Sequence, residues 1–589
     1  MATRMFDIFQ ERYAQDPDSI VLAAKENGQW RTYTSREVWE TARLLAGGLL
    51  SRGIQNGDGS PEAQEKIALI SFNRPEWVLA DIATQLTGAV LTPLYPTISP
   101  TEMEFVLREA GVRKIFVENQ QLFDRFEEAL SRLPEDLEIY SFEPVPGLQH
   151  WQELTALQLQ PDDALIQSIA PQALATIIYT SGTTGAPKGV MLSHHNIVSN
   201  VYGALPVFTF ATPGDKTLSF LPLNHIFERT IIYIYTAAGL QTWFAESMET
   251  IGDNLKEVKP FVFTTVPRLL EKVYERIVGK GLELSGVKKA LFFWALNLAK
   301  RYDNAQDLGA WYNLQLKWAD KLIFSKWREA LGGRVMAVVS GSAALQERLI
   351  RIFTAAGIVV MEGYGLTETS PVISVNRYES EGRRIGTIGP LIDDVTVKIA
   401  EDGEILCKGP NIMMGYYKRP EQTAEALRDG WFHTGDIGEW VAGRFLKITD
   451  RKKEIFKTSG GKYVAPQAIE NKMRESIFIE QIMVLGANRK FVSALIVPSF
   501  AQLYNHLKEK GIDAPQDPRA LIAMPEVKRL IRQQLDKYNP LFGHVEQVKK
   551  FALLPQEWSI DQGELTPSLK MKRKVIEERY AGIINELYN

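Results

Sequence analysis

The stretch ATIIYTSGTTGAPKGVMLSH, residues 175–194, concentrates residue types that bind anions. A predicted apolar strand over residues 175–179 is followed by glycines and hydroxyl residues and then by a lysine. Glycines let the backbone approach an anion closely, hydroxyls donate hydrogen bonds to phosphate oxygens, and a lysine adds positive charge. The pattern predicts a phosphate-binding loop that contains Thr180, Ser181, Gly182, Thr183, Thr184, Gly185 and Lys188.

This loop is not a Walker A motif, because Lys188 is followed by glycine instead of serine or threonine. A flexible surface linker has a similar composition, but a linker seldom follows a buried strand directly and then ends in a lysine. The stretch instead resembles the phosphate-loop signature of the adenylate-forming superfamily, which contains acyl-CoA synthetases, peptide-synthetase adenylation domains and luciferases. At least six motifs resemble that family in its own order and cover nearly the whole chain.

Two further motifs resemble the adenine-binding strand ends of the family: SGSAAL at residues 340–345 and MEGYGLTETSP at residues 361–371. The resemblance implies that Tyr364 offers an aromatic face to adenine. It also implies that Glu368 and Thr180 hold Mg²⁺, for which carboxylate oxygen is a suitable hard ligand. The other nucleotide-binding residues implied here are Gly341, Ser342, Ala343, Glu362, Gly363, Gly365 and Thr367.

The motif WFHTGDIG, residues 431–438, resembles the ribose-binding motif, in which Asp436 would accept hydrogen bonds from both ribose hydroxyls. An isolated Thr-Gly-Asp is equally typical of a β-turn. Asp450 and Arg451 resemble the hinge pair of the family: Asp450 would absorb a backbone rotation, and Arg451 would reach the nucleotide. A charged surface linker is the alternative for this pair, but KTSGGKYVAP, which follows shortly after, matches acyl-CoA synthetases.

The segment ELTPSLKMKRKVIEE, near the C-terminus, resembles the part of the family that carries its mobile catalytic lysine. By position that lysine is Lys570, with Arg573 three residues on. Many members have glycine before this lysine, whereas this chain has Leu569, so Lys572 stays open as an alternative. An exposed basic helix start would have the same composition.

The acyl substrate is addressed by two motifs. In LPLNHIFERT, residues 221–230, the resemblance places His225 by the acyl carboxylate, although a lone histidine is more often structural. VPRLLEKVYERI, residues 266–277, resembles the fatty-acid gate of long-chain enzymes, with an amphipathic surface helix as the alternative. His194 and His195 suggest a metal pair only superficially, since no further ligand has suitable spacing.

Together these motifs predict a long-chain fatty acyl-CoA synthetase that uses ATP, Mg²⁺ and CoA and forms an acyl-adenylate intermediate. The implied catalytic residues are Thr180, His225, Glu368 and Lys570. An acyl-acyl-carrier-protein synthetase shares the adenylation step and stays open as an alternative. A catalytically dead lipid- or nucleotide-binding scaffold is disfavoured by the presence of the candidate residues, and luciferase-like oxygenation and amino-acid activation are weak alternatives. The sequence does not determine the chain length of the fatty acid, the oligomeric state or the metabolic pathway.

The elements that position these residues alternate between strand and helix. A capping box at residues 34–37 predicts a helix through Leu50, and apolar runs at residues 66–72 and 88–95 flank a predicted helix over 74–86. Such βαβ alternation predicts an α/β fold with an open, largely parallel sheet that binds ligands at the carboxyl ends of its strands. After about residue 390 the pattern changes to short strands.

The expected organisation is a large N-terminal domain over residues 1–449, with mixed, mostly parallel sheets, flanking helices and a small β-barrel-like subdomain. A hinge and linker over residues 450–466 leads into a small mobile α+β C-terminal domain over residues 451–589. Residues 281–331 are predicted to be an insert of two long helices. The insert holds eight basic and five acidic residues, and Trp311, Leu314, Trp318 and Leu322 fall on one helical stripe. These features suggest contact with a membrane surface, whereas burial of the same helices on the core is the alternative.

Composition excludes several classes of protein. The 589 residues contain 67 Lys and Arg against 71 Asp and Glu, a net charge of −4 that argues against a nucleic-acid partner. The single cysteine, Cys407, excludes internal disulfides and Cys-rich metal sites. We find no signal peptide and no apolar run of the roughly 20 residues that would span a bilayer. We therefore expect a cytoplasmic protein, with peripheral contact at the inner face of the cytoplasmic membrane as an open question.

Overall fold

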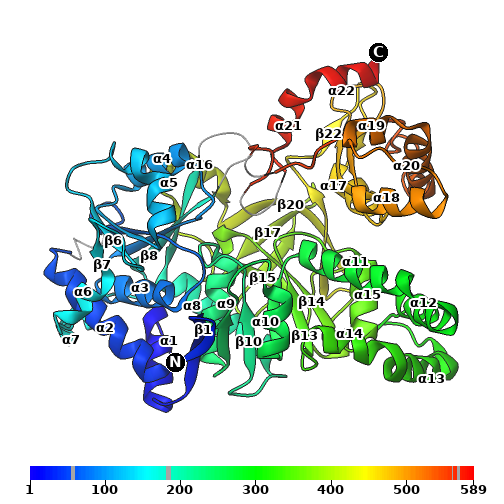
Figure 1. The fold of residues 1–589 in the computed structure, drawn as a ribbon. Coiled ribbons are helices and arrows are strands. Elements are labelled where there is room, and N and C mark those ends of the chain that lie inside the picture. Colours follow the sequence, from blue (N-terminus) through cyan, green and yellow to red (C-terminus); the bar gives the residue numbers. More distant parts are fainter. Residues whose placement is uncertain (55–59, 181–186, 560–561, 567–570) are drawn as a thin grey trace.

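The computed structural model describes residues 1–54, 60–180, 187–559, 562–566 and 571–589. Its described residues form two eight-stranded sheets, a five-stranded sheet and a smaller C-terminal unit (Figure 1). This architecture agrees with the predicted α/β class. None of the described helices combines the length and apolar composition needed to cross a membrane.

The first large sheet has the strand order β18-β9-β8-β4-β3-β5-β6-β7. Its strands from β4 to β7 run parallel, and β8 and β9 form an antiparallel hairpin beside β4. The strands are β3 (Lys66–Ile70), β4 (Val90–Leu94), β5 (Lys114–Val117), β6 (Glu138–Ser141), β7 (Gln149–His150), β8 (Leu174–Thr180), β9 (Lys188–Ser193) and β18 (Gly415–Tyr416).

The second large sheet has the order β15-β14-β13-β12-β10-β11-β1-β2, and the strands from β14 to β1 run parallel. The strands are β1 (Ile20–Glu26), β2 (Gln29–Thr34), β10 (Lys216–Ser219), β11 (Gln241–Phe244), β12 (Val262–Thr265), β13 (Ala337–Ser340), β14 (Val359–Gly365) and β15 (Val372–Val375). The third sheet contains β16 (Thr396–Ile399), β17 (Glu404–Lys408), β19 (Leu427–Arg428), β20 (Trp431–Val441) and β21 (Phe445–Arg451).

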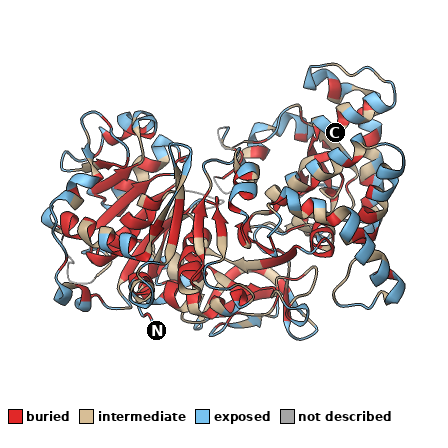
Figure 2. Ribbon diagram, turned by 60° about the horizontal axis from the view of Figure 1, so that its bottom comes forward, coloured by how far each residue is buried: buried red, intermediate tan, exposed pale blue. Residues whose placement is uncertain are grey.

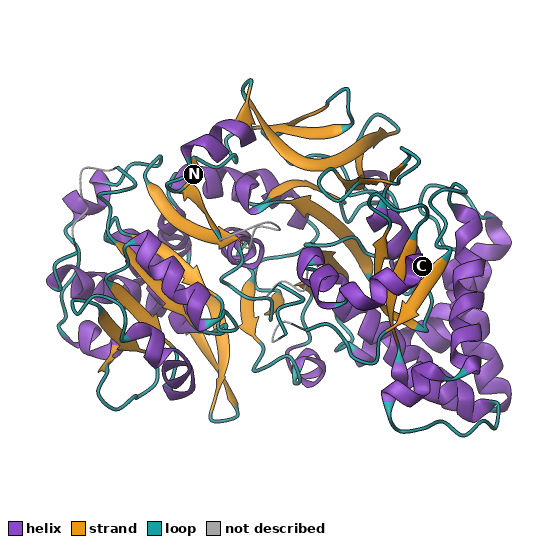
Figure 3. Ribbon diagram, turned by 90° about the horizontal axis from the view of Figure 1, so that it is seen from above, coloured by secondary structure: helices purple, strands orange, loops and turns teal. Residues whose placement is uncertain are grey.

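Helices cover the sheets and separate them (Figure 3). The predicted capping box is present: Thr34 caps α2 and accepts a hydrogen bond from the backbone of Glu37. The helices up to residue 426 are α1 (Met5–Gln15), α2 (Ser35–Ser51), α3 (Pro75–Leu86), α4 (Pro100–Ala110), α5 (Gln120–Leu130), α6 (Trp151–Ala156), α7 (Asp163–Ser168), α8 (His194–Ala204), α9 (Ile226–Ala237), α10 (Ile251–Val258), α11 (Pro267–Glu283), α12 (Gly286–Lys300), α13 (Gly309–Ala319), α14 (Ser325–Ala330), α15 (Glu347–Ala355) and α16 (Pro420–Ala426).

One hydrophobic core joins the two large sheets through α3, α8 and α9 (Figure 2). Every residue of α3 except Glu76 is buried. The guanidinium of Arg229 on α9 lies in this core, bonds to the carboxylate of Asp81 on α3 and donates to the hydroxyl of Thr176 at 2.8 Å. Apolar packing therefore joins the two sheets, and the buried Arg229–Asp81 pair links α9 to α3 within this core.

The C-terminal unit, residues 456–589, has hydrophobic cores made only of its own residues. Its three-stranded sheet has the order β24-β25-β26. The elements are β22 (Phe456–Lys457), β23 (Tyr463–Val464), α17 (Pro466–Met473), β24 (Ile479–Leu485), β25 (Ser493–Pro498), α18 (Phe500–Glu509), α19 (Pro518–Ala523), α20 (Pro525–Tyr538), β26 (Lys550–Leu553), α21 (Arg573–Arg579) and α22 (Ala581–Tyr588).

Three local features differ from what the sequence predicts. The MEGYG part of the second adenine motif lies inside β14 instead of following the strand, because its first two residues pair with β13 and its last three pair with β15. The segment 450–466 is partly ordered into strands, since Asp450 and Arg451 end β21 and a short hairpin follows. The second helix of the insert is divided into α13 and α14 by a π-helical turn, Asp320–Phe324.

The helical insert is part core and part surface. Phe292 and Trp327 are buried, as the structural alternative predicts. The stripe of Trp311, Leu314, Trp318 and Leu322 is exposed by 70%, 46%, 55% and 41%, respectively. The insert therefore packs on the fold with one side and presents a large apolar stripe to solvent with the other.

Candidate active site

The two ends of the phosphate-loop motif lie side by side. Thr180 ends β8 and Lys188 begins β9, and the two residues are register partners in the antiparallel ladder. The hydroxyl of Thr180 donates to the Lys188 carbonyl at 3.5 Å. The predicted loop residues Ser181, Gly182, Thr183, Thr184 and Gly185 lie outside the described residues. The ladder therefore places the backbone of Lys188 beside that of Thr180.

Tyr416 connects this stem to Glu368. The ammonium of Lys188 lies 5.2 Å from the centroid of the Tyr416 ring, a cation–π distance. The Tyr416 hydroxyl donates to Oε1 of Glu368 at 2.8 Å. Desolvation and the neighbouring Glu368 carboxylate raise the pKa of Tyr416, which keeps its hydroxyl protonated as a donor. Tyr416 lies outside every motif found in the sequence.

The two adenine motifs meet because β13 and β14 are neighbouring parallel strands, with Ser340 opposite Glu362. The Leu345 N–H donates to Glu362 Oε1 at 3.0 Å and thereby ties the loop after β13 to β14. Gly365 must be glycine, since a Cβ there would lie 1.7 Å from the Pro371 carbonyl oxygen.

The remaining residues of these motifs line the same strand ends. A Cβ on Gly341 would lie 3.2 Å from the ring of Phe227. Ser342 has a positive φ of 69°, an uncommon conformation for a residue with a side chain. Ala343 continues the same loop, Gly363 lies within β14, and Thr367 is buried just after that strand.

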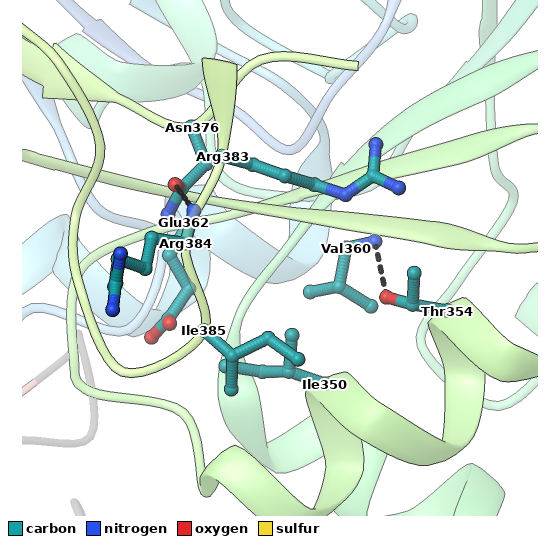
Figure 4. Close-up of a pocket in the computed structure, with 8 residues that line it drawn as sticks. All are labelled: Ile350, Thr354, Val360, Glu362, Asn376, Arg383, Arg384 and Ile385. Carbon is teal, nitrogen blue, oxygen red and sulfur yellow. Dashed lines mark hydrogen bonds between the residues drawn. The ribbon is translucent and has the colours of Figure 1, made fainter. Parts of the chain in front are cut away.

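Glu362 also lines a small pocket beside β14 (Figure 4). Burial raises the pKa of Glu362 to about 8, so its carboxyl is largely neutral at pH 7. The pocket is lined by Ile350, Thr354, Val360, Glu362, Asn376, Arg383, Arg384 and Ile385.

The predicted ribose residue Asp436 and the predicted hinge residue Arg451 form one hydrogen-bonded group with the adenine motif. The Tyr364 hydroxyl donates to Asp436 Oδ2 at 2.6 Å, and Arg451 Nε donates to Asp436 Oδ1 at 3.0 Å. Asp436 is only 4% exposed. The Tyr364 hydroxyl therefore orients the carboxylate that is proposed to bind ribose.

These contacts make a continuous arc of side chains from three sheets. The arc runs from Lys188 through Tyr416 to Glu368, and then along the chain to Tyr364, Asp436 and Arg451. We call these six residues the nucleotide arc. It brings the phosphate, adenine and ribose motifs together in one group of side chains.

The residues proposed to hold Mg²⁺ are compatible with it. Glu368 supplies a carboxylate and Thr180 a hydroxyl, which are oxygen ligands of the kind that Mg²⁺ prefers. Tyr416 orients the carboxylate through one of its two oxygens. Among the described residues, no group of three His, Cys, Asp or Glu side chains is arranged to hold a metal ion alone.

His225 caps α9, and its Nδ1 accepts the backbone N–H of Phe227 at 3.1 Å. Phe227 in turn lies against Gly341 of the adenine motif. The hydrogen bond to Phe227 therefore links His225 to a ring that lies beside Gly341 of the adenine motif. The neighbouring His194 belongs to the core: it is buried, its Nδ1 accepts the Met5 N–H at 3.3 Å, and burial lowers its pKa to about 3.

The predicted catalytic Lys570 lies outside the described residues. Close by in sequence, Lys572 lies 3.9 Å from Glu102 of α4, on the large unit. Arg573 is buried between Glu454 and Glu470 of the C-terminal end of the chain, so it anchors this segment to the rest of the C-terminal unit. Lys572 therefore contacts the large unit, whereas Arg573 pairs with acids that precede it in the C-terminal part of the chain.

The described fold and the nucleotide arc together define a nucleotide-binding α/β enzyme with a separate C-terminal unit. Residues 9–417 match the family model described as AMP-binding enzyme, and residues 453–589 match the one described as AMP-binding enzyme C-terminal domain. The chain therefore belongs to the AMP-binding enzyme family, in its long-chain acyl-CoA synthetase branch.

Curated relatives support this branch. The chain is 34% identical to the long-chain-fatty-acid–CoA ligase FadD15 of Mycobacterium bovis, over 98% of this chain and 96% of that protein. It is 31% identical to human long-chain-fatty-acid–CoA ligase 1, over 100% of this chain and 87% of that protein.

Solved structures share the fold. The adenylation domain of a carboxylate reductase from Mycobacterium chelonae has a TM-score of 0.76 at 20% identity, with 99% of this chain and 91% of that chain covered. An anthranilate CoA ligase in complex with anthranoyl-AMP has a TM-score of 0.71 at 17% identity, with 98% and 97% covered.

Proposed function

We propose that the protein is a long-chain fatty acid–CoA ligase. A carboxylate oxygen of the fatty acid attacks the α-phosphorus of ATP, and pyrophosphate leaves. The CoA thiolate then attacks the acyl carbon of the acyl-adenylate, and AMP leaves. The observation that carries the proposal is the nucleotide arc, which joins motifs separated by hundreds of residues into one site, in a chain whose relatives are named long-chain-fatty-acid–CoA ligases.

The residues of the site serve the first step by charge and position. Lys188 and the loop after Thr180 hold phosphate oxygens, and Asp436 holds the ribose while Tyr364 supports it. Glu368 and Thr180 would hold Mg²⁺, which neutralises phosphate charge when it is bound. Lys570 would stabilise the negative charge of the pentacoordinate transition state at the α-phosphorus, and His225 would contact the acyl carboxylate. Such prearranged charge is a major source of catalysis in reactions of this type.

The second step needs a different arrangement of the two units, because the same site must first release pyrophosphate and then bind the CoA thiol. We propose that the chain divides at Asp450 into a large domain and a C-terminal domain, and that the latter rotates about this residue between the two steps. Asp450 ends β21, directly before the segment that leads to the C-terminal cores.

The thiol acceptor is tested directly. Purified protein is incubated with palmitate, ATP and Mg²⁺, and CoA or holo-acyl-carrier protein is then offered separately. We expect AMP and palmitoyl-CoA with CoA, and at most slow transfer to the carrier protein. Exclusive transfer to the carrier protein would favour the alternative synthetase, and absence of pyrophosphate release with any fatty acid would contradict the proposed activity.

We also propose that the enzyme contacts anionic membrane surfaces through residues 281–331. Trp311 and Trp318 are the most exposed residues of the stripe, and Lys317 and Lys321 are exposed within the same turns. Tryptophan and lysine together are typical of interfacial helices, and the long-chain substrate partitions into bilayers. The exposure of the stripe is the observation that favours contact over burial.

Liposome co-sedimentation tests this contact. We expect wild-type protein to bind vesicles that contain phosphatidylglycerol, to bind less in high salt, and to lose binding in Trp311→Ala/Trp318→Ala and in Lys317→Glu/Lys321→Glu. Lys508→Glu/Lys510→Glu, on the exposed surface of the C-terminal unit, is the matched charge control. Wild-type protein that stays in the supernatant at low salt would contradict the proposal.

A further inference from the structure

Four charged residues face each other where α11 meets the C-terminal unit. Arg268 pairs with Glu480, and Arg474 Nη2 lies 3.0 Å from Glu271 Oε1. We call Arg268, Glu271, Arg474 and Glu480 the interdomain latch. Its N-terminal members lie one helical turn apart on α11, and its C-terminal members lie at the end of α17 and on β24.

The latch is reciprocal, because each unit contributes one positive and one negative group. Arg268 of α11 also lies 3.6 Å from Glu271, so the two pairs form a network. The Gln346 amide reinforces it by donating to Glu271 at 3.1 Å and to the Arg474 carbonyl at 3.1 Å. These residues line a cleft between the two units, together with Tyr274 and other residues.

Because the two carboxylates of the latch are buried, loss of their partners would cost free energy. The carboxylate side chains of Glu271 and Glu480 are only 9% and 8% exposed, whereas the two arginines are about one-third exposed. Fully exposed ion pairs contribute little to stability, but a buried carboxylate that loses its partner is strongly unfavourable. Separation of the two units therefore requires that both acids regain water or new partners.

The position of the latch relative to Asp450 gives it a role in rotation. Arg474 and Glu480 follow Asp450 in the chain, and Arg268 and Glu271 precede it, so rotation about Asp450 pulls each pair apart. On the other side of the same interface, Lys572 lies 3.9 Å from Glu102. This contact holds the segment next to position 570 against the large unit, as the adenylation step requires if Lys570 acts there.

We propose that the interdomain latch holds the C-terminal unit in the adenylate-forming orientation, and that it must open before thioester formation. The latch thus sets the balance between the two half-reactions. The N-terminal half of the latch lies on α11, within the segment 266–277 that resembles a fatty-acid gate, which places the acyl site and the latch on one helix. The inference rests on the proposed two-step function.

Domain orientation is measured by energy transfer between dyes on Gln306→Cys and Lys508→Cys, two exposed positions on different units. The native Cys407 is buried and its pKa is raised to about 12 by burial, so it should not be labelled. Glu480→Ala should change the transfer efficiency in the ligand-free protein relative to the labelled parent. Glu475→Ala is the matched control, because Glu475 pairs with Lys472 within the C-terminal unit.

The half-reactions are measured on the same variants. Glu480→Ala and Arg268→Ala should each slow pyrophosphate release by roughly tenfold, since one broken partner leaves the other uncompensated. Thioester formation from supplied acyl-adenylate and CoA should be unchanged or faster. The double variant should be no slower than the slower single variant, because both substitutions remove the same contact.

Two results would contradict the proposed role of the latch. The first is that Glu480→Ala has the same energy-transfer efficiency and the same rates of both half-reactions as the labelled parent. The second is that the effects of Glu480→Ala and Arg268→Ala are strictly additive in the double variant. Failure of the proposed function looks different, since it would show as no pyrophosphate release in the parent protein. The energy-transfer measurement would still report whether the latch controls orientation in that case.

Discussion

At the residue scale, the nucleotide arc depends on two contacts of Tyr416. Its hydroxyl orients Glu368, and its ring lies beside Lys188. Tyr416→Phe keeps the ring and removes the hydrogen bond, which for a charged acceptor is worth about 1.5–3 kcal/mol. We expect pyrophosphate release to fall by roughly tenfold to a hundredfold and the Mg²⁺ concentration for half-maximal rate to rise.

The neighbouring residue supplies the control for this change. Tyr417→Phe is the same substitution one position on, and the ring of Tyr417 lies near Lys66 instead of Lys188. We expect it to leave the Mg²⁺ dependence unchanged. A Tyr416→Phe enzyme with the Mg²⁺ dependence of the wild type would show that this hydrogen bond does not position Glu368 for catalysis.

Lys570 should act in one half-reaction only. We expect Lys570→Ala to slow acyl-adenylate formation by about 10²–10³-fold, because groups that stabilise transition-state charge are typically worth that much. Thioester formation from supplied acyl-adenylate should be largely spared. Both rates are measured by rapid quench.

A second lysine, Lys572, tests whether the catalytic lysine is assigned to the correct position. Lys572→Ala should slow adenylate formation far less than Lys570→Ala, because the Lys572 ammonium forms only a partly exposed pair with Glu102, and such pairs contribute little. A selective loss in Lys572→Ala instead would move the catalytic role by two residues. Equal loss of both half-reactions in Lys570→Ala would indicate a structural role.

Most of these residues were proposed from contiguous motifs, whereas the contacts between motifs could not be predicted from the sequence. Glu368, Asp436 and Arg451 each belong to a run of residues with its own local pattern. Tyr416 lies in the two-residue strand β18, 48 residues from the acid that it orients, and nothing in its neighbours signals that contact. The same limit explains why the bond from Tyr364 to Asp436 was not anticipated.

At the scale of elements, Glu362 joins β14 to the loop after β13. Burial raises its pKa from an ordinary 4.5 to about 8. The folded protein therefore binds more protons than the unfolded chain between these two pH values, and the free energy of unfolding should fall as pH rises through this window. Glu362→Gln keeps the acceptor oxygen and removes this dependence.

Urea denaturation at pH 5, 7 and 8.5 checks this prediction. We expect the unfolding free energy of Glu362→Gln, relative to wild type, to increase by more than about 1 kcal/mol from pH 5 to pH 8.5, because one pKa unit corresponds to about 1.4 kcal/mol. The exposed Glu401→Gln is the control. Parallel pH profiles for wild type and Glu362→Gln would show that the carboxyl is ionised in the folded protein.

Local signals predicted the helices and strands of the βαβ region well. The helix expected from the capping box at residues 34–37 is α2, and the expected strand over residues 66–72 is β3 with two fewer residues. The π-helical turn Asp320–Phe324 was not predictable, because helical spacing continues through it and only packing reveals the extra residue. Strand β14 extends through MEGYG because β15 pairs with it, which is a non-local cause.

At the scale of the whole molecule, the sequence predicted a large unit, a short connection and a small unit, but not how the connection is built. The chain at 450–466 is rich in charge and glycine, which is typical of a linker. In the structure Asp450 still belongs to β21, opposite Ile437 of β20. Its Oδ1 accepts the Arg451 N–H at 2.5 Å, and burial raises its pKa to about 6. The proposed hinge therefore starts from an ordered strand end.

That origin makes the hinge testable with one substitution. Proline fixes φ near about −65° and removes the N–H, so Asp450→Pro should restrict rotation at this residue. Asp450→Ala is the control, because alanine leaves the backbone free to rotate. We expect Asp450→Pro to retain one half-reaction and to lose most of the other, measured as pyrophosphate release and as transfer from supplied acyl-adenylate to CoA.

The half-reaction that survives identifies the orientation in which the proline holds the units. The interdomain latch and the contact of Lys572 with Glu102 both favour the adenylate-forming orientation, so pyrophosphate release should be the one that remains. A folded Asp450→Pro protein with full overall turnover would place the rotation elsewhere. The next place to test would then be the chain between Arg451 and the first strand of the C-terminal unit, since the latch contacts must still separate for a thiol to enter.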